Sequence, residues 1–127
     1  MTKPAERVLY GAPRPDGSIP FWRTSTLWAA AQGKHQVSIP LEDLNILDDI
    51  VWFGGPKDVR PTVRKVAERA RDIFAADLNY PIIMTAKGEV LDGAHRIARA
   101  YLQGKQTIPA VVIDEWPEPD GFVESSN

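Results

Sequence analysis

The stretch PIIMTAKGEVLDGAHRIARAYLQG, residues 81–104, decides the fold of this chain. Its two short apolar runs flank Ala-Lys-Gly at 86–88, and this pattern predicts a β-hairpin whose turn uses the backbone freedom of Gly88. From about Ala94 onward, apolar residues recur at three- and four-residue spacing until Gly104 provides a typical helix stop. The stretch therefore predicts strand, turn, strand and helix, with the helix beginning within two residues of the second strand.

The segments on either side of this stretch complete a mixed α+β pattern. Residues 36–40 and 108–113 have the composition of strands. Residues 59–76 predict the clearest helix, because six apolar side chains fall on one face at helical spacing. These six are Val63, Val66, Ala67, Ala70, Ile73 and Phe74. The order strand, helix, hairpin, helix, strand indicates a small α+β domain with a mixed sheet.

The two ends of the chain are richer in proline than the centre. We expect residues 1–35 to form an N-terminal extension with one short helix, capped by Thr24 or Ser25. Residues 36–115 form the expected domain, and residues 116–127 are expected to leave the fold as a C-terminal tail.

The composition is that of an ordinary globular domain. The 127 residues are 43% hydrophobic and 25% charged, and 15 basic against 17 acidic side chains give a net charge of −2. There is thus no global positive field to attract nucleic acid. The absence of cysteine excludes disulfides, thiolate metal sites and a thiol nucleophile. With neither a secretory signal pattern nor an apolar run of ~18 residues, we expect a cytoplasmic protein without membrane contact.

The junction Asp92-Gly93-Ala94-His95-Arg96 carries the residues best suited to chemistry. A helix start leaves backbone N–H groups unpaired and carries partial positive charge, which together favour an anion. Gly93 permits close backbone approach, and Arg96 can hold a phosphate through two parallel hydrogen bonds. His95 can donate a hydrogen bond or shuttle a proton. Asp92 is suited to binding a magnesium ion or orienting a hydroxyl nucleophile.

A purely structural interpretation of the same residues stays open. In that interpretation Asp92 only caps the helix, and His95 is a surface residue of its first turn. Arg96 then pairs with a neighbouring carboxylate and does not hold a ligand. Both interpretations fit residues of these types at a strand–helix corner.

Residues 37–114 resemble the ParB/sulfiredoxin-like superfamily. The resemblance implies that nucleotide phosphates bind at the corner formed here by Gly93, Ala94, His95 and Arg96. Because this superfamily hosts several chemistries, the resemblance is more specific for fold than for activity. The matching pieces are Ile39-Pro40-Leu41-Glu42-Asp43-Leu44, Tyr80-Pro81-Ile82-Ile83, the segment 88–96, Gly104 and Ile108-Pro109-Ala110-Val111-Val112.

Two branches of the superfamily match only in part. Sulfiredoxins, which reduce cysteine sulfinic acid with ATP, are similar at Gly93, His95 and Arg96. Their cysteine falls where this chain has Ala94, so a chain without any thiol is not a sulfiredoxin. ParB partition proteins, which bind CTP and a DNA site, are similar at Gly93 and Arg96. They carry a further helical DNA-binding domain, for which we expect no room in this chain.

A third branch, the ADP-dependent free serine kinases, resembles the chain in an Asp-Gly-His-His-Arg motif. The motif is matched by Asp92, Gly93, His95 and Arg96, with Ala94 in place of the first histidine. Those kinases place an acidic residue shortly after the first strand as base for the substrate hydroxyl.

Asp48 and Asp49 occupy the matching stretch of this chain. The resemblance makes them candidate general bases, and near Asp92 they would divide hydroxyl activation and metal positioning. The alternative is that both side chains only cap or solvate a helix end.

Two further features have a functional and a structural interpretation. The basic residues between Arg60 and Arg71 form either a nucleic-acid surface or a solvated helix face. The aromatic loop Trp52-Phe53-Gly54-Gly55-Pro56 either covers a base or substrate or fills part of the core.

Together these observations predict a protein that binds a nucleoside di- or triphosphate (ATP, ADP or CTP) with Mg²⁺. The expected activity is that of a small phosphotransferase acting on an unknown small-molecule acceptor, or of a nucleotide hydrolase. The alternatives are a non-enzymatic regulator that senses nucleotide or associates with DNA, and an interaction module whose pocket has decayed.

Overall fold

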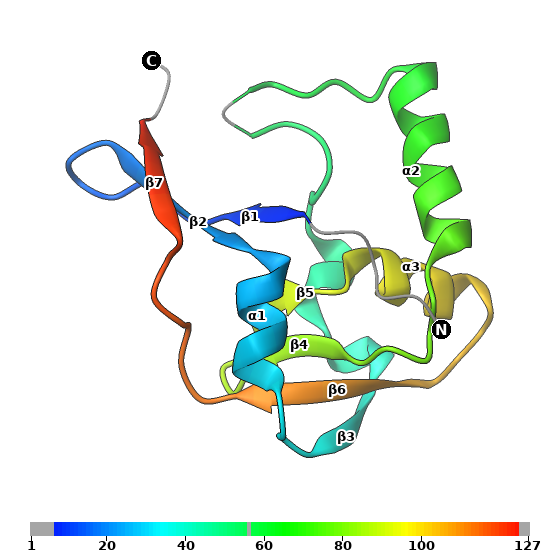
Figure 1. Cartoon of the computed structure of the whole chain (residues 1–127). Coiled ribbons are helices and arrows are strands. Elements are labelled where there is room, and N and C mark those ends of the chain that lie inside the picture. Colours follow the sequence, from blue (N-terminus) through cyan, green and yellow to red (C-terminus); the bar gives the residue numbers. More distant parts are fainter. Residues whose placement is uncertain (1–6, 56, 125–127) are drawn as a thin grey trace.

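The computed structural model describes residues 7–55 and 57–124 and confirms the α+β class (Figure 1). The strands form two separate sheets. The smaller sheet is antiparallel, with the order β1 (Val8–Tyr10), β2 (Ser18–Arg23) and β7 (Gly121–Glu124). The larger sheet has the order β3 (Gln36–Pro40), β6 (Thr107–Ile113), β4 (Ile82–Thr85) and β5 (Val90–Asp92).

The helices lie around the larger sheet. In chain order they are α1 (Thr24–Ala31), the 3-10 turns η1 (Leu41–Asp43) and η2 (Asn45–Asp48), α2 (Val63–Ala75) and α3 (Ala94–Leu102). No helix in the described ranges is long and apolar enough to cross a membrane.

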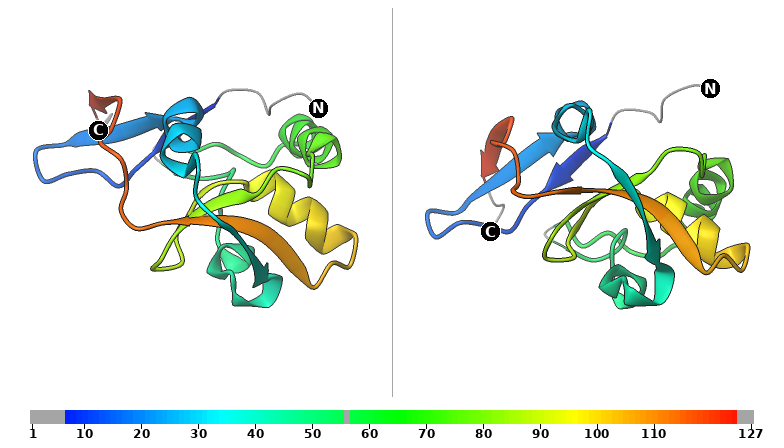
Figure 2. Two further views of the ribbon diagram at one scale, coloured as in Figure 1. Left: turned by 60° about the horizontal axis from the view of Figure 1, so that its bottom comes forward. Right: turned by 90° about the horizontal axis from the view of Figure 1, so that it is seen from below.

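The larger sheet has a buried cluster on each face. Successive residues of a strand point to opposite sides, so Ile82 and Met84 of β4 face one cluster while Ile83 faces the other. The first cluster includes Ile97 of α3, and the second includes Leu27 of α1. In Figure 2, α1 and α3 accordingly lie on opposite sides of the sheet. α3 is therefore fixed to the sheet by its apolar face.

The predicted hairpin is present where the sequence places it. β4 and β5 pair antiparallel, and the amide of Gly88 donates to the carbonyl of Thr85 at 3.0 Å. Gly88 has a φ of 93°, which explains the glycine in this turn. β4 also pairs parallel with β6, so the sheet is mixed.

The expectation for the two ends of the chain is wrong in part. Residues 121–124 do not leave the fold, because β7 pairs with β2 along its length. The extension accordingly holds two strands besides its helix. Trp22 stabilises the junction, since its indole donates to the carbonyl of Pro117 at 2.7 Å and packs 4.6 Å from the ring of Trp116. The prolines in these segments made strands hard to predict from the sequence. Pro20 lacks an amide N–H, but its carbonyl still accepts a hydrogen bond from the amide of Gly11.

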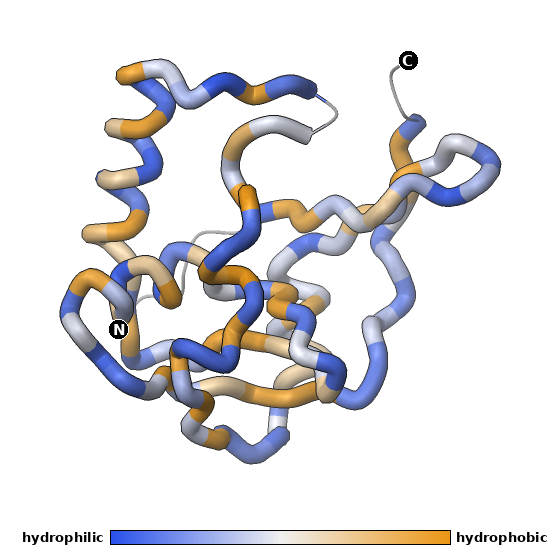
Figure 3. The backbone as a smooth tube through the Cα atoms, turned by 180° about the vertical axis from the view of Figure 1, so that it is seen from behind, coloured by the Kyte–Doolittle hydropathy of each residue, from blue (hydrophilic) through white to orange (hydrophobic). Residues whose placement is uncertain are grey.

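α2 differs from the prediction in the exposure of its apolar face. The helix starts one residue after Thr62, whose hydroxyl accepts from the amide of Lys65 at 3.2 Å. The apolar stripe is present, but Val63 is 89% exposed and Phe74 is 66% exposed. Figure 3 shows the hydrophobic positions of α2 along its outer edge, away from the rest of the molecule. No residue of α2 is buried.

Candidate functional site

Gly93 forms a tight corner between β5 and α3. Its φ is 122°, and a Cβ at this position would lie 2.5 Å from Cγ2 of Ile82. Both facts exclude an ordinary side chain without rearrangement. The carbonyl of Gly93 accepts from the amide of Ile97 at 2.9 Å and so starts the helix. The first-turn amides of α3 point outward from this corner, as at any helix start.

Asp92 and Arg96 form a buried ion pair under the first turn of α3. Nη2 of Arg96 donates to Oδ2 of Asp92 at 3.0 Å, and the indole of Trp28 donates to the same oxygen at 2.9 Å. Arg96 is only 5% exposed, and its buried Nε has no hydrogen-bond partner. Asp92 therefore positions Arg96, which agrees with the structural interpretation of that pair.

The same contacts argue against Asp92 as a magnesium ligand. Its Oδ2 already accepts from a guanidinium and an indole, so a cation at that oxygen would have to displace Arg96. Across residues 7–55 and 57–124, no three acidic, histidine or cysteine side chains gather as a metal site. Oδ2 of Asp92 is therefore already in use, and a Mg²⁺ ion that binds together with a nucleotide stays a prediction.

His95 lies between two arginines from distant parts of the chain. Nη1 of Arg7 lies 2.7 Å from Nδ1 of His95 and 3.1 Å from Nε2, and Nη1 of Arg69 lies 3.2 Å from Nε2. The imidazole also stacks on the ring of Trp52, with centroids 4.9 Å apart. Burial, followed by the charges of Arg7 and Arg69, lowers the pKa of His95 to about 4. The ring is therefore neutral at pH 7.

This cluster holds more donors than acceptors. A neutral imidazole has one acceptor nitrogen, yet guanidinium groups approach both ring nitrogens of His95. Arg7 and Arg69 share the single carboxylate of Asp72, at 3.9 Å and 3.8 Å. We call Arg7, Arg69, Asp72, His95 and the underlying Arg96 the basic corner. Its surplus of positive charge and of donors favours an anion.

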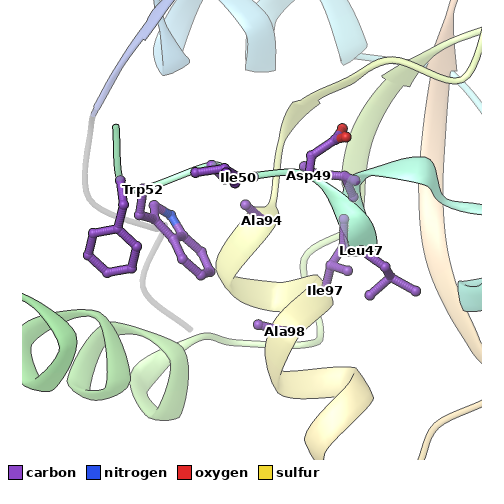
Figure 4. Close-up of a pocket in the computed structure, with 10 residues that line it drawn as sticks. Leu47, Asp49, Ile50, Trp52, Ala94, Ile97 and Ala98 are labelled. Carbon is purple, nitrogen blue, oxygen red and sulfur yellow. The ribbon is translucent and has the colours of Figure 1, made fainter. Parts of the chain in front are cut away.

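An apolar pocket of about 310 Å³ adjoins the basic corner. Its walls come from η2, the segment that follows it and the first two turns of α3. Figure 4 shows the indole of Trp52 beside the α3 turn that carries Ala94, and the carboxylate of Asp49 directed away from Ile97 and Ala98. A second pocket of about 320 Å³, lined by charged side chains of α2, lies on the other side of Trp52.

The structure brings most of the predicted site residues together. Gly93, Ala94, His95 and Arg96 share the first turn of α3, and Ala94 lines the apolar pocket with Asp49. Asp48 and Asp49 are both exposed, and Asp48 does not line that pocket. Pro56 of the aromatic loop lies outside the described residues.

The basic helix is less available to nucleic acid than its composition suggests. Four of the basic side chains between Arg60 and Arg71 pair with carboxylates of the same stretch, and Arg60 itself precedes α2. These pairs are Arg60 with Asp58, Lys65 with Glu68, and both Arg69 and Arg71 with Asp72.

Sequence reasoning missed Arg7, which is 88 residues from His95. Its backbone is held by Thr24: the amide of Arg7 donates to the Thr24 hydroxyl at 3.0 Å, and its carbonyl accepts from the Thr24 amide at 2.9 Å. No local sequence pattern predicts the contact between Arg7 and His95. The N-terminal extension thus contributes a residue to the corner that the central domain forms.

Comparison of this chain with protein-family models, with curated proteins and with solved structures finds no match in any of the three. The likeness to the ParB/sulfiredoxin-like superfamily therefore stays a prediction. The function is therefore argued from the contacts of His95 with Arg7, Arg69 and Trp52.

Proposed function

We propose that this protein binds a nucleoside di- or triphosphate, with its phosphates at the basic corner and its base in the apolar pocket beside Trp52. The main support for this proposal is that Arg7 and Arg69 both contact His95 at the first turn of α3. The two arginines share the single carboxylate of Asp72. A phosphate group would supply the acceptors that this arrangement lacks.

Both arginines can reach a ligand. The side chains of Arg7 and Arg69 are 43% and 37% exposed, so neither guanidinium is sealed inside the protein. The first-turn amides and partial positive charge of α3 add to the attraction. Arg96 lies beneath this corner, buried and held by Asp92, whose carboxylate offsets most of its charge.

The apolar pocket is suited to a planar base. Its volume of about 310 Å³ lies at the lower end of small-ligand sites. Trp52 stands where the pocket meets the basic corner, since it lines the pocket and stacks on His95. A base that stacks on the indole would place its phosphates towards the arginines.

Phosphotransfer or hydrolysis would need a base near the terminal phosphate. Of the two predicted aspartates, Asp49 lines the pocket with Ala94, but its exposed carboxylate is directed away from α3, so it would have to turn towards the basic corner to reach the phosphates. The carboxylate would then take the proton of the acceptor hydroxyl or water. The oxygen of the acceptor hydroxyl or water would then bond to the terminal phosphorus, while the bond between that phosphorus and the departing nucleotide breaks.

Thermal unfolding with ATP, ADP, CTP and GTP, each with and without Mg²⁺, tests binding. A ligand at about 100 times its dissociation constant stabilises a fold by about 2.7 kcal/mol, which raises Tm by several degrees. We expect such a shift for at least one nucleotide and its loss in Arg69→Gln. Arg60→Gln is the matched control, because that exposed side chain pairs with Asp58 at 3.1 Å. An equal shift in Arg69→Gln would contradict the proposed site.

Turnover separates binding from catalysis. If Asp49 is the base, Asp49→Asn keeps the thermal shift and loses phosphate release or transfer, whereas Asp48→Asn keeps both. Binding without turnover in the unmodified protein would leave a nucleotide-sensing protein.

A further inference from the structure

α2 faces the rest of the molecule with its charged side. The charged pocket is lined by five charged side chains of α2, together with Trp52, Phe53 and Val59 of the preceding loop. The five are Lys65, Glu68, Arg69, Arg71 and Asp72. The side chain of Asp72 is 25% exposed, whereas Phe74 is 66% and Val63 is 89% exposed. The usual arrangement of an amphipathic surface helix is the opposite.

The outward stripe has a defined shape. Val63 and Phe74 stand near its two ends, and Ala67 and Ala70 lie between them on the same face, at 100° per residue. Ala67 is exposed, whereas Ala70 and Ile73 are half-buried at the edge that faces the molecule. The small alanines leave the middle of the stripe shallower than its ends. Such a surface accepts the side-chain ridge of another helix at close approach.

The border of the stripe is basic. Arg64 and Arg71 are seven residues apart, so they lie on one side of the helix next to Ala67. Both are exposed, and Arg71, with 71% of its side chain in solvent, also contacts the carboxylate of Asp72 at 3.4 Å. Carboxylates on a partner would meet these two groups.

A second copy of this chain fits the stripe poorly. Two copies of α2, packed antiparallel about an axis between Ala67 and Ala70, would place Glu68 opposite Glu68 and Arg64 near Arg71. Each border carries two arginines and one glutamate, so two net positive borders would face each other, which disfavours self-association.

We propose that the outward face of α2 is a docking surface for an amphipathic helix of another protein. That partner helix carries large apolar residues opposite Ala67 and Ala70 and carboxylates opposite Arg64 and Arg71. The apolar stripe points away from the basic corner, and the two surfaces adjoin at Arg71, which contacts Asp72.

Two synthetic peptides of about 18 residues serve as probes. Both carry a leucine stripe, one bordered by glutamate and the other by lysine at the same positions. Anisotropy of the labelled peptides with the full chain measures binding. We expect the glutamate peptide to bind about tenfold or more tightly than the lysine peptide. The double variant Arg64→Glu/Arg71→Glu should reverse that preference.

Variants of the stripe test its role without disturbing the core. Ala67→Glu and Phe74→Ser should each weaken the glutamate peptide about tenfold or more. Tyr10→Ser is the matched control, since Tyr10 is a 53% exposed aromatic on the other sheet, and it should change nothing.

Three results would overturn the proposal. The first is equal affinity for both peptides, or affinity for neither. The second is concentration-dependent dimerisation in sedimentation that Ala67→Glu abolishes, which would make a second copy the occupant. The third is co-sedimentation with phosphatidylglycerol vesicles that Phe74→Ser abolishes, which would make a lipid surface the occupant.

Discussion

α2 and α3 look alike in the sequence and behave in opposite ways in the structure. Each has apolar residues at helical spacing with basic residues between them. α3 buries Ile97 and Ala100 against the sheet, at 2% and 1% exposed, and leaves Tyr101 and Leu102 near its end 58% and 62% exposed. α2 turns its stripe outward and directs charged groups towards Arg7 and His95. Periodicity thus predicts a helix but does not determine which face turns inward.

The largest expected contrast concerns two ion pairs, one between β5 and α3 and the other on α2. Asp92→Ala leaves the buried Arg96 charge without its partner and should cost about 3–5 kcal/mol of unfolding free energy. Glu68→Ala removes the exposed pair with Lys65 and should cost about 0–1 kcal/mol. Urea unfolding of both variants measures the difference. Equal losses would mean that the two helices are held by the same kind of interaction.

The apolar stripes provide the next contrast. Ile97→Ala opens a cavity in the core and should cost about 2–5 kcal/mol. Val63→Ala changes a side chain in solvent and should stay within about 0.5 kcal/mol of the unmodified protein. The same urea experiment decides the matter. A loss above about 1 kcal/mol for Val63→Ala would show that the outward face of α2 is covered in solution.

Much of the fold could be predicted from residues 81–104, because the hairpin and α3 depend on local signals. Gly88 provides a turn with positive φ, and Gly93 separates β5 from α3. The smaller sheet could not be predicted, since β2 contains a proline and pairs with a strand about 100 residues away. Such pairing is decided by tertiary contacts such as those of Trp22.

The candidate site divides in the same way. The sequence pointed to Gly93, Ala94, His95 and Arg96, because their neighbours along the chain mark a helix start. It did not indicate Arg7 or Asp72, which reach His95 only through the fold. It also left the role of Asp92 open until the contacts with Trp28 and Arg96 showed how its carboxylate is used.

Two glycines with positive φ allow the cost of an unfavourable backbone angle to be separated from the cost of a steric clash. Gly88→Ala meets no atom within 4 Å and should cost about 1–2 kcal/mol for its backbone angle alone. Gly93→Ala places a methyl 2.5 Å from Ile82, so it should cost about 1–3 kcal/mol more. Thermal unfolding compares the two variants. A smaller loss of stability for Gly93→Ala than for Gly88→Ala would contradict the close approach of Ile82 to Gly93.

The smallest expected effect is the dependence of stability on pH. The folded pKa of His95, about 4, lies below its ordinary value of 6.5, so the unfolded chain binds more protons between these two values. Stability should therefore fall as pH decreases from 6.5 towards 4, by about 1 kcal/mol after solvent screening. His95→Gln should remove this part of the pH dependence in urea unfolding at pH 7 and pH 5. An unchanged slope in that variant would assign the effect to other groups.

The most direct test of the basic corner is the pKa of His95, measured by NMR titration without nucleotide and with millimolar ATP, ADP or CTP. Phosphate bound between Arg7 and Arg69 would offset their charges and favour the imidazolium. We predict that the pKa of His95 starts near 4 and rises by at least about one unit with a nucleotide that binds. A pKa that stays near 4 with a nucleotide that stabilises the fold would place the phosphates elsewhere and contradict the proposed site.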